Sequence, residues 1–290
     1  MAVVNTNANA SIAQNALARN ERAMNTAMER LSTGQRINTA ADDAAGLAIA
    51  SRMTSQIRGL EVGIRNANDA ISMISTADGA LIEVTNMLQR MRELALQASN
   101  GTTTSADRAY LSQEYANLLA EIDRIAENTQ WNGMSILNHT TDASSQFAFQ
   151  VGANGGQTIA VNFGNLTQGT IASVSGIMDD VASAAGTITA TTSASAITTG
   201  SAAVRYIDSA ITSVNSQRAT FGASMNQLTY AVDNLSNVKV NAEAARSRVL
   251  DTDYAQETSE LARTQIIQQA GTAMLAQANQ LPQTVLSLLQ

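Results

Sequence analysis

Few side chains in this sequence could carry out catalysis or hold a metal ion. Cysteine is absent and His139 is the only histidine, so neither a thiolate site, a histidine metal cluster nor a serine–histidine triad can form. Two pairs of neighbouring carboxylates remain, Asp42-Asp43 and Asp179-Asp180. A general acid–base pair needs flanking groups that tune its pKa, and neither pair has them. We interpret the first pair as a helix start and the second as loop surface, and we expect no enzyme activity, catalytic residue, cofactor or metal site.

The composition and charge of the chain argue against nucleic acid and membranes as partners. The 290 residues carry a net charge of −7, and Lys239 is the only lysine. No basic cluster is present to neutralise a phosphate backbone, so we expect no nucleic-acid partner. No run of 18 apolar residues could cross a membrane. The first residues lack a charged segment followed by an apolar core, so we expect export, if it occurs, without a cleaved signal peptide.

The elements that carry these residues are predicted from apolar spacing. Residues 11–31 have helical spacing, which ends at Gly34, and a second helix is expected to start near Asp42. From Ile57 to Ala95 apolar residues alternate in steps of three and four, as in a coiled coil. The pattern takes an extra short step at Asp78-Gly79, which predicts local overwinding of one continuous rod.

The middle of the chain has a different pattern. A third helix is predicted around residues 111–125, and residues 147–151 and 158–163 alternate like the strands of a β-hairpin. Residues 187–201 are a Ser/Thr/Ala run that predicts an exposed loop. Helical spacing returns over residues 204–235, with Arg218 as a register-setting polar residue. The predicted fold is mainly α: a long antiparallel helical rod or coiled coil with paired N- and C-terminal helices and a small β-hairpin region in the middle of the chain.

The two ends carry narrow apolar stripes with a spacing of seven. These stripes consist of Leu17, Met24 and Leu31 near one end, and Ile267, Met274, Leu281 and Leu288 near the other. Both segments are rich in alanine, asparagine and glutamine, so one helix pair would bury little area against a large ordering entropy. We therefore expect the ends to be disordered in the monomer and to fold when neighbouring copies assemble.

Four segments of the sequence resemble bacterial flagellin: residues 30–50, 150–156, 245–255 and 265–289. The resemblance implies a filament subunit that is secreted by the flagellar export system and polymerises with itself outside the cell for swimming motility. It also implies an export chaperone, a filament cap and hook-junction proteins as partners. By the same resemblance, residues 1–42 with 252–290 form an inner coiled-coil domain and residues 43–166 with 203–251 an outer helical domain. Residues 167–202 are a short variable segment in place of large outer domains.

Residues 89–95 with Glu114 resemble the surface that the vertebrate toll-like flagellin receptor recognises. The residues that match are Arg90, Leu94 and Glu114. Two alternative functions stay open at this point. One is a hook–filament junction protein, which shares the terminal coiled-coil pattern, and the other is an adhesin or immune ligand displayed on a filament.

Overall fold

The computed structural model describes residues 7–138, 146–164, 166 and 195–287. His139, Asp179, Asp180 and Leu288 lie outside these residues. Contacts divide the chain into two compact units, residues 1–57 with 240–290 and residues 58–239. The boundaries of these units reflect contacts within one chain. The predicted domain boundaries at 42/43 and 251/252 instead separate the layers of an assembly, and they stay a prediction.

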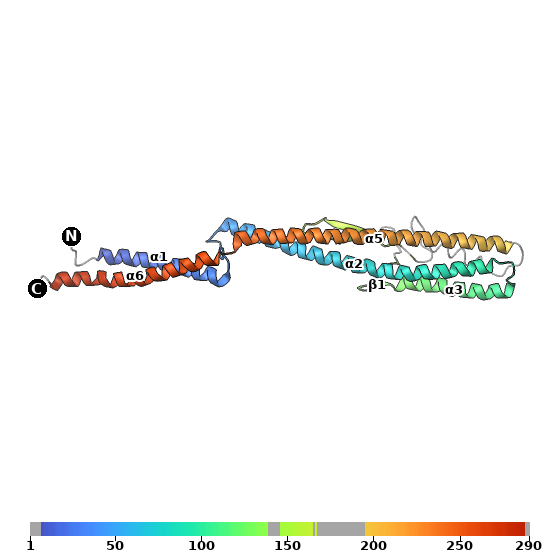
Figure 1. Ribbon diagram of the computed structural model, residues 1–290, viewed down its shortest axis with the longest axis horizontal. Helices are drawn as coiled ribbons and strands as arrows, with labels where there is room; N and C mark the ends of the chain where they lie inside the picture. The colour runs from blue at the N-terminus through green and yellow to red at the C-terminus, as the bar shows by residue number, and fades with distance from the viewer. Residues whose placement is uncertain (1–6, 139–145, 165, 167–194, 288–290) are drawn as a thin grey trace. The chain divides into compact units, whose positions relative to one another are not determined.

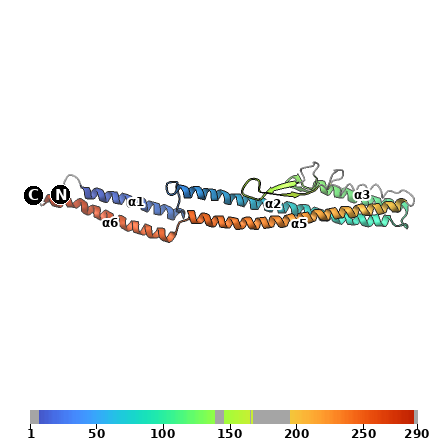
Figure 2. The same ribbon diagram turned by 90° about the horizontal axis from the view of Figure 1, so that it is seen from above.

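The first unit is built on two terminal helices that lie side by side and run in opposite directions (Figure 1, Figure 2). They are α1 (Ala8–Thr33) and α6 (Tyr254–Ser287). The side chain of Asn7 caps the start of α1, and Gly34 ends it in a left-handed conformation with φ of 71°. The predicted pairing of the terminal helices is therefore confirmed.

The long helices of the second unit surround a continuous apolar core. They belong to α2 (Ala44–Ala98), α3 (Ser105–Asn128) and α5 (Ser195–Leu250), of which α2 and α5 also contribute residues to the first unit. The predicted three-four spacing on α2 is buried, for example at Ile74, Leu81 and Leu88. Tyr115 and Ile122 of α3 and Phe221 of α5 complete the same core. The mainly helical fold predicted from the sequence is confirmed.

Two short antiparallel sheets follow α3. Strand β1 (Gln130–Trp131) pairs with β2 (Met134–Ser135), and the turn between them places Asn132 and Gly133 at positive φ, as an Asn-Gly hairpin turn requires. The predicted hairpin is formed by β3 (Gln146–Gln150) and β4 (Thr158–Asn162), with Phe149 opposite Ile159. Trp131 packs against the core.

The loop of the β3–β4 hairpin sits directly on helix α2 where the helix carries two glycines. A Cβ built on Gly63 would lie 2.7 Å from the backbone oxygen of Val151, and one on Gly59 would lie 3.0 Å from the Cβ of Ala153. Asn66 fixes the same contact by donating from Nδ2 to the carbonyl of Gln150 at 2.9 Å. The glycine pair therefore permits a close backbone approach, and its partner is the hairpin loop.

Two sequence predictions about α5 have different outcomes. The exposed loop predicted for residues 187–201 is wrong over 195–201, because these residues already form the first turns of α5. Alanine in this run favours helix, and the absence of proline allows it. Arg218 donates from Nε to Asp78 Oδ1 at 2.8 Å, which places a polar pair at the predicted overwound step of an uninterrupted α2. Across the described helices, none has a stretch long and apolar enough to span a membrane.

Candidate assembly surface of the terminal helices

The face shared by α1 and α6 is lined with small and polar side chains. Its partly or fully buried positions on both helices recur in steps of three and four. On α1 they are Ala10, Ala13, Leu17, Asn20, Met24, Ala27 and Leu31, and on α6 they are Glu257, Leu261, Thr264, Gln268, Gly271, Leu275 and Ala278. We call this set the seam. Because large apolar groups are few in it, the seam removes little apolar area from water.

Hydrogen bonds across the seam set its register. Asn20 is buried and donates from Nδ2 to the backbone oxygen of Thr264 at 2.8 Å and to Oε1 of Gln268 at 3.2 Å. Asn7 donates from Nδ2 to the backbone oxygen of Ala278 at 2.8 Å. A slip of one helix along the other would leave the buried Asn20 amide and the half-buried Asn7 amide without these acceptors, so the polar bonds specify one alignment.

A glycine on α6 accommodates the first residue of the predicted N-terminal stripe. A Cβ built on Gly271 would lie 2.9 Å from Cδ1 of Leu17, so the leucine side chain rests against the α6 backbone. Leu17, Met24 and Leu31 are all half-buried in the seam. The structure therefore brings the N-terminal stripe together on the α6-facing side of α1.

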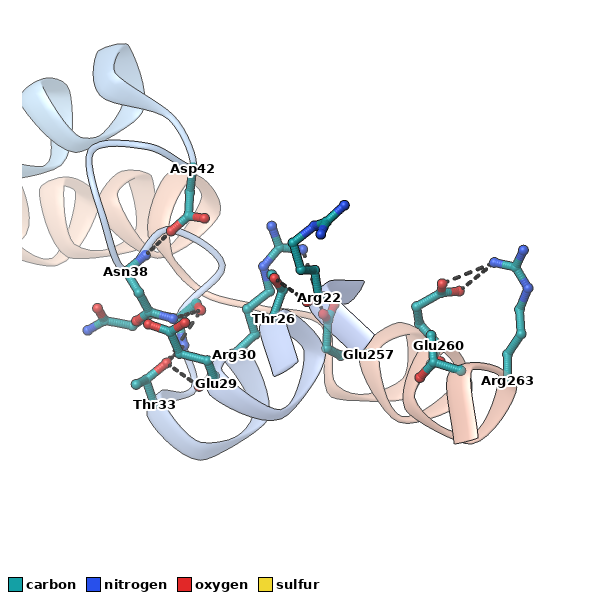
Figure 3. Close-up of polar contacts among 12 residues, drawn as sticks. Arg22, Thr26, Glu29, Arg30, Thr33, Asn38, Asp42, Glu257, Glu260 and Arg263 are labelled. Atoms are coloured by element: carbon teal, nitrogen blue, oxygen red, sulfur yellow. Dashed lines mark hydrogen bonds and ion pairs between the residues drawn. The ribbon is translucent and has the colours of Figure 1, made fainter. Parts of the chain in front are cut away.

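The helix pair is anchored at the end where α1 stops and α6 begins. Arg30 lies 3.6 Å from Glu257 across the pair (Figure 3). Just beyond α1, the backbone N–H of Arg36 donates to the carbonyl of Leu250 at 2.7 Å, and Thr252 donates to Gly34 at 3.1 Å. A short antiparallel bridge thus joins the two segments that flank the terminal helices.

The two aspartates at the start of α2 have structural partners. Asp42 accepts hydrogen bonds from the backbone N–H groups of Thr39 and Asn38, which hold the pKa of its carboxyl below the ordinary value (Figure 3). Asp43 accepts from the N–H of Gly46 at 2.8 Å and so caps α2. The interpretation of this pair as a helix start is confirmed. Among the described residues, no group of three or more potential ligands comes together to hold a metal ion.

The C-terminal stripe lies beside the seam rather than in it. Ile267 is 41 % exposed and Met274 is 66 % exposed, each one position before a seam residue of α6. Their neighbour Ile266 is 67 % exposed. The side chain of Leu281 and the whole of Leu288 lie outside the described residues. Ile266, Ile267 and Met274 are therefore large apolar groups of α6 that α1 does not cover, whereas Leu261 and Leu275 are half-buried in the seam.

The three residues of the candidate receptor surface have unequal access to solvent. Arg90 of α2 donates to Glu114 of α3 at 2.9 Å and to Glu93 at 3.0 Å on the surface. The bonds to Glu93 and Glu114 hold the pKa of the Arg90 guanidinium above its ordinary value. Leu94 is only 1 % exposed and belongs to the core. The structure thus brings Arg90 and Glu114 together and places Leu94 beneath the surface.

Sequence reasoning missed the polar and small members of the seam. Asn20, Thr264, Gln268 and Gly271 occupy seam positions although none is a large apolar residue. A search for large apolar groups spaced by seven finds the stripe beside the seam in α6. The signal that was available is the three-four alternation of small residues, read together with the half-buried leucines Leu261 and Leu275.

Known proteins match both ends of this chain. Residues 4–142 match the bacterial flagellin N-terminal helical region, and residues 204–289 match the bacterial flagellin C-terminal helical region. A flagellin of Halalkalibacterium halodurans is 46 % identical over 264 residues, which cover 91 % of each chain. Flagellin A of Vibrio cholerae is 35 % identical, with 99 % of each chain covered.

A solved structure is similar in fold. It is a putative flagellar hook-associated protein from Vibrio parahaemolyticus, with a TM-score of 0.60 and 16 % sequence identity over 72 % of this chain and 100 % of that chain. This likeness concerns the fold alone, whereas the more similar sequences are flagellins. The chain belongs to the bacterial flagellin family and is a structural, non-enzymatic subunit that self-assembles into the extracellular flagellar filament.

Proposed function

We propose that the terminal helices assemble through the C-terminal stripe that flanks the seam. On assembly, neighbouring copies of the chain cover Ile267 and Met274. The observation that carries this proposal is the position of these side chains: they are large apolar groups of α6 that α1 leaves exposed. Burying a large aliphatic side chain contributes about 1.5–3 kcal/mol. Repeated over many subunits, this contribution favours the polymer over the single chain.

The same surface supports the proposal that the ends gain order on assembly. The seam is held by small residues and by amides such as Asn20, so the isolated pair has little apolar burial to offset its ordering entropy. Contacts from neighbouring copies add the missing burial. In this proposal residues 1–42 with 252–290 form the inner layer of the filament, and residues 43–166 with 203–251 form the outer layer, with Leu281 and Leu288 continuing the stripe.

The test compares two double variants of the stripe. Ile267→Gln with Met274→Gln removes apolar surface, whereas Ile267→Leu with Met274→Leu retains it. Assembly of the purified chain is induced by a salting-out salt and measured by sedimentation and electron microscopy. The glutamine variant should stay in the supernatant and the leucine variant should polymerise. Filament formation by the glutamine variant at the parental concentration would contradict the proposal.

Ordering on assembly has its own measurement. Amide hydrogen exchange of α1 and α6 is followed in the single chain and in the polymer. The proposal expects fast exchange in both helices before assembly and strong protection afterwards. Strong protection of both helices in the single chain would reject it, even if the stripe is required for polymerisation.

We also propose that Arg90 and Glu114 form part of a surface that the vertebrate toll-like flagellin receptor recognises. Support comes from their pairing across α2 and α3, with about half of each side chain accessible, at 50 % and 45 %. In this proposal Leu94 acts from the core by holding α2 in place. Arg90→Ala should lower receptor signalling in reporter cells, whereas Arg124→Ala, which removes another paired surface arginine, should not. Equal signalling by both variants would refute the assignment.

The remaining partners follow from the family and are part of the same proposal. The chain is exported by the flagellar secretion system without a cleaved signal peptide, and it meets an export chaperone, a filament cap and hook-junction proteins. These assignments are supported by flagellin relatives that match over nearly the whole chain. Loss of extracellular chain in cells lacking the flagellar export apparatus, with normal synthesis, is the expected result. Continued release from such cells would contradict it.

A further inference from the structure

Helix α6 contains the only proline of the chain inside its helical range. Pro282 lies within Tyr254–Ser287. Proline has no backbone N–H, so it cannot donate the helical hydrogen bond to the carbonyl four residues earlier. That carbonyl belongs to Ala278, a seam residue. The carbonyl oxygen of Ala278 therefore lacks its usual helical donor.

The side chain of Asn7 supplies a hydrogen bond to this same oxygen. Asn7 Nδ2 donates to the backbone oxygen of Ala278 at 2.8 Å. The other end of the same amide, Oδ1, accepts from the backbone N–H of Ala10 at 3.1 Å and caps α1. An asparagine amide has both a donor and an acceptor end, so one side chain caps an N-terminal N–H of α1 and supplies a donor to a carbonyl that position 282 cannot serve.

We propose that Asn7 and Pro282 together position the start of α1 on α6, and we call the Asn7 contact with Ala278 the amide clamp. The proline creates the acceptor and the asparagine fills it while capping its own helix. Because the rest of the seam is small, a specific bond near the end of the pair has a large share in fixing the alignment. The inference rests on the proposed assembly function, since the alignment decides which α6 groups remain exposed for neighbouring copies.

Three variants separate the two roles of Asn7. Asn7→Ser keeps an oxygen that caps a helix but is too short to donate to Ala278, whereas Asn7→Ala removes both roles. Pro282→Ala restores an N–H at position 282, which can donate to the Ala278 carbonyl within α6. A double-mutant cycle between Asn7→Ser and Pro282→Ala therefore reports on the clamp rather than on the cap.

The expected result is an effect of Asn7→Ser that depends on the proline. In the parental chain, Asn7→Ser should raise the critical concentration for polymerisation by about fivefold, equivalent to about 1 kcal/mol. In the Pro282→Ala chain, the same substitution should change it by less than about twofold, because the carbonyl already has a donor. Equal effects in the two backgrounds, or no effect in the parental chain, would overturn the inference.

A second measurement does not depend on polymerisation. The single chain is first placed in an osmolyte that orders the terminal helices without assembly. Under this condition the Ala10 amide should be protected in Asn7→Ser and unprotected in Asn7→Ala, because only the serine retains the cap. Exchange of the α1 start should also be faster in Asn7→Ser than in the parental chain, and Pro282→Ala should remove this difference. If Asn7→Ser still speeds exchange at the start of α1 in the Pro282→Ala background, the proposed amide clamp is refuted, although the stripe can still mediate assembly. If the glutamine stripe variant polymerises, the assembly proposal fails and this exchange cycle still decides the clamp.

Discussion

A methyl group added at Gly63 would meet the backbone of the β3–β4 hairpin loop, whereas the same group added at Gly79 would meet nothing. The Cβ of Gly63→Ala would lie 2.7 Å from the oxygen of Val151 and 3.0 Å from its carbonyl carbon. Beyond the neighbouring residues and the backbone of α2 itself, no atom lies within 4 Å of a Cβ built on Gly79. Both glycines are interior residues of α2, so the two substitutions make a matched pair.

The magnitude follows from two opposing contributions. Alanine in place of glycine inside a helix is favourable by about 1 kcal/mol, and this gain applies at both positions. Overpacking against a backbone that has to move costs about 1–3 kcal/mol, and this cost applies only at Gly63. Gly79→Ala should therefore raise the unfolding free energy by about 1 kcal/mol. The unfolding free energy of the Gly63→Ala chain should be lower than that of the Gly79→Ala chain by about 1–3 kcal/mol.

Urea unfolding of the full chain measures the difference, and amide exchange locates it. The N–H of Val151, which donates to the Gln157 carbonyl at 3.0 Å, should lose protection in Gly63→Ala and keep it in Gly79→Ala. Gly222→Ala in α5, another site with no atom within 4 Å, serves as a second control. If Gly63→Ala stabilised the chain as much as Gly79→Ala, with Val151 still protected, the glycine contact would not hold the hairpin.

Three further outcomes can be measured on the same protein. Asn20→Ala should destabilise the assembled terminal helices by about 1–2 kcal/mol, because the backbone oxygen of Thr264 and Oε1 of Gln268 lose their Asn20 donor; an unchanged urea midpoint of the polymer would contradict this. The Thr104 hydroxyl and N–H hold the pKa of the Asp107 carboxyl below its ordinary value. The carboxylate therefore contributes its full stabilisation of the folded chain above about pH 3.9, and this stabilisation is lost as the pH falls through the lowered pKa of the folded state. Thr104→Ala should flatten this acid dependence in a pH series of thermal unfolding. Hydrogen peroxide should oxidise Met274, which is 66 % exposed, well before Met91, which is 0 % exposed; equal rates by peptide mass spectrometry would be inconsistent with the structure.

The helical part of the fold could be predicted because its sequence signals are repeated many times. The spacing from Ile57 to Ala95 identifies the buried face of α2, and all of those positions are buried or half-buried. Asp78 marks the irregular step, and the structure places its carboxylate against Arg218. The hairpin was equally visible because period-two alternation flanks a glycine-rich turn. Local patterns of this kind need no knowledge of distant partners.

The seam of the terminal helices could not be located in the same way. Ile267 and Met274 have the strongest apolar spacing in α6, yet they lie next to the seam because α1 presents Asn20 to Thr264 and Leu17 to Gly271. Which face of a helix meets its partner depends on the shape and hydrogen bonding of that partner. These properties come from residues more than 240 positions away, as the separation of 244 between Asn20 and Thr264 shows. Single-segment periodicity contains no such information.

The antiparallel pairing of α1 with α6 has a consequence for the order of folding events. The contact between Asn7 and Ala278 joins residues 271 positions apart, so it closes a very long loop. By the logarithmic dependence on loop length, that closure costs about 5 kcal/mol when the intervening chain is unstructured. Structure in the second unit shortens the effective loop and lowers this cost. Helix α1, although synthesised well before α6, therefore has no native partner until the chain has been made as far as Ala278.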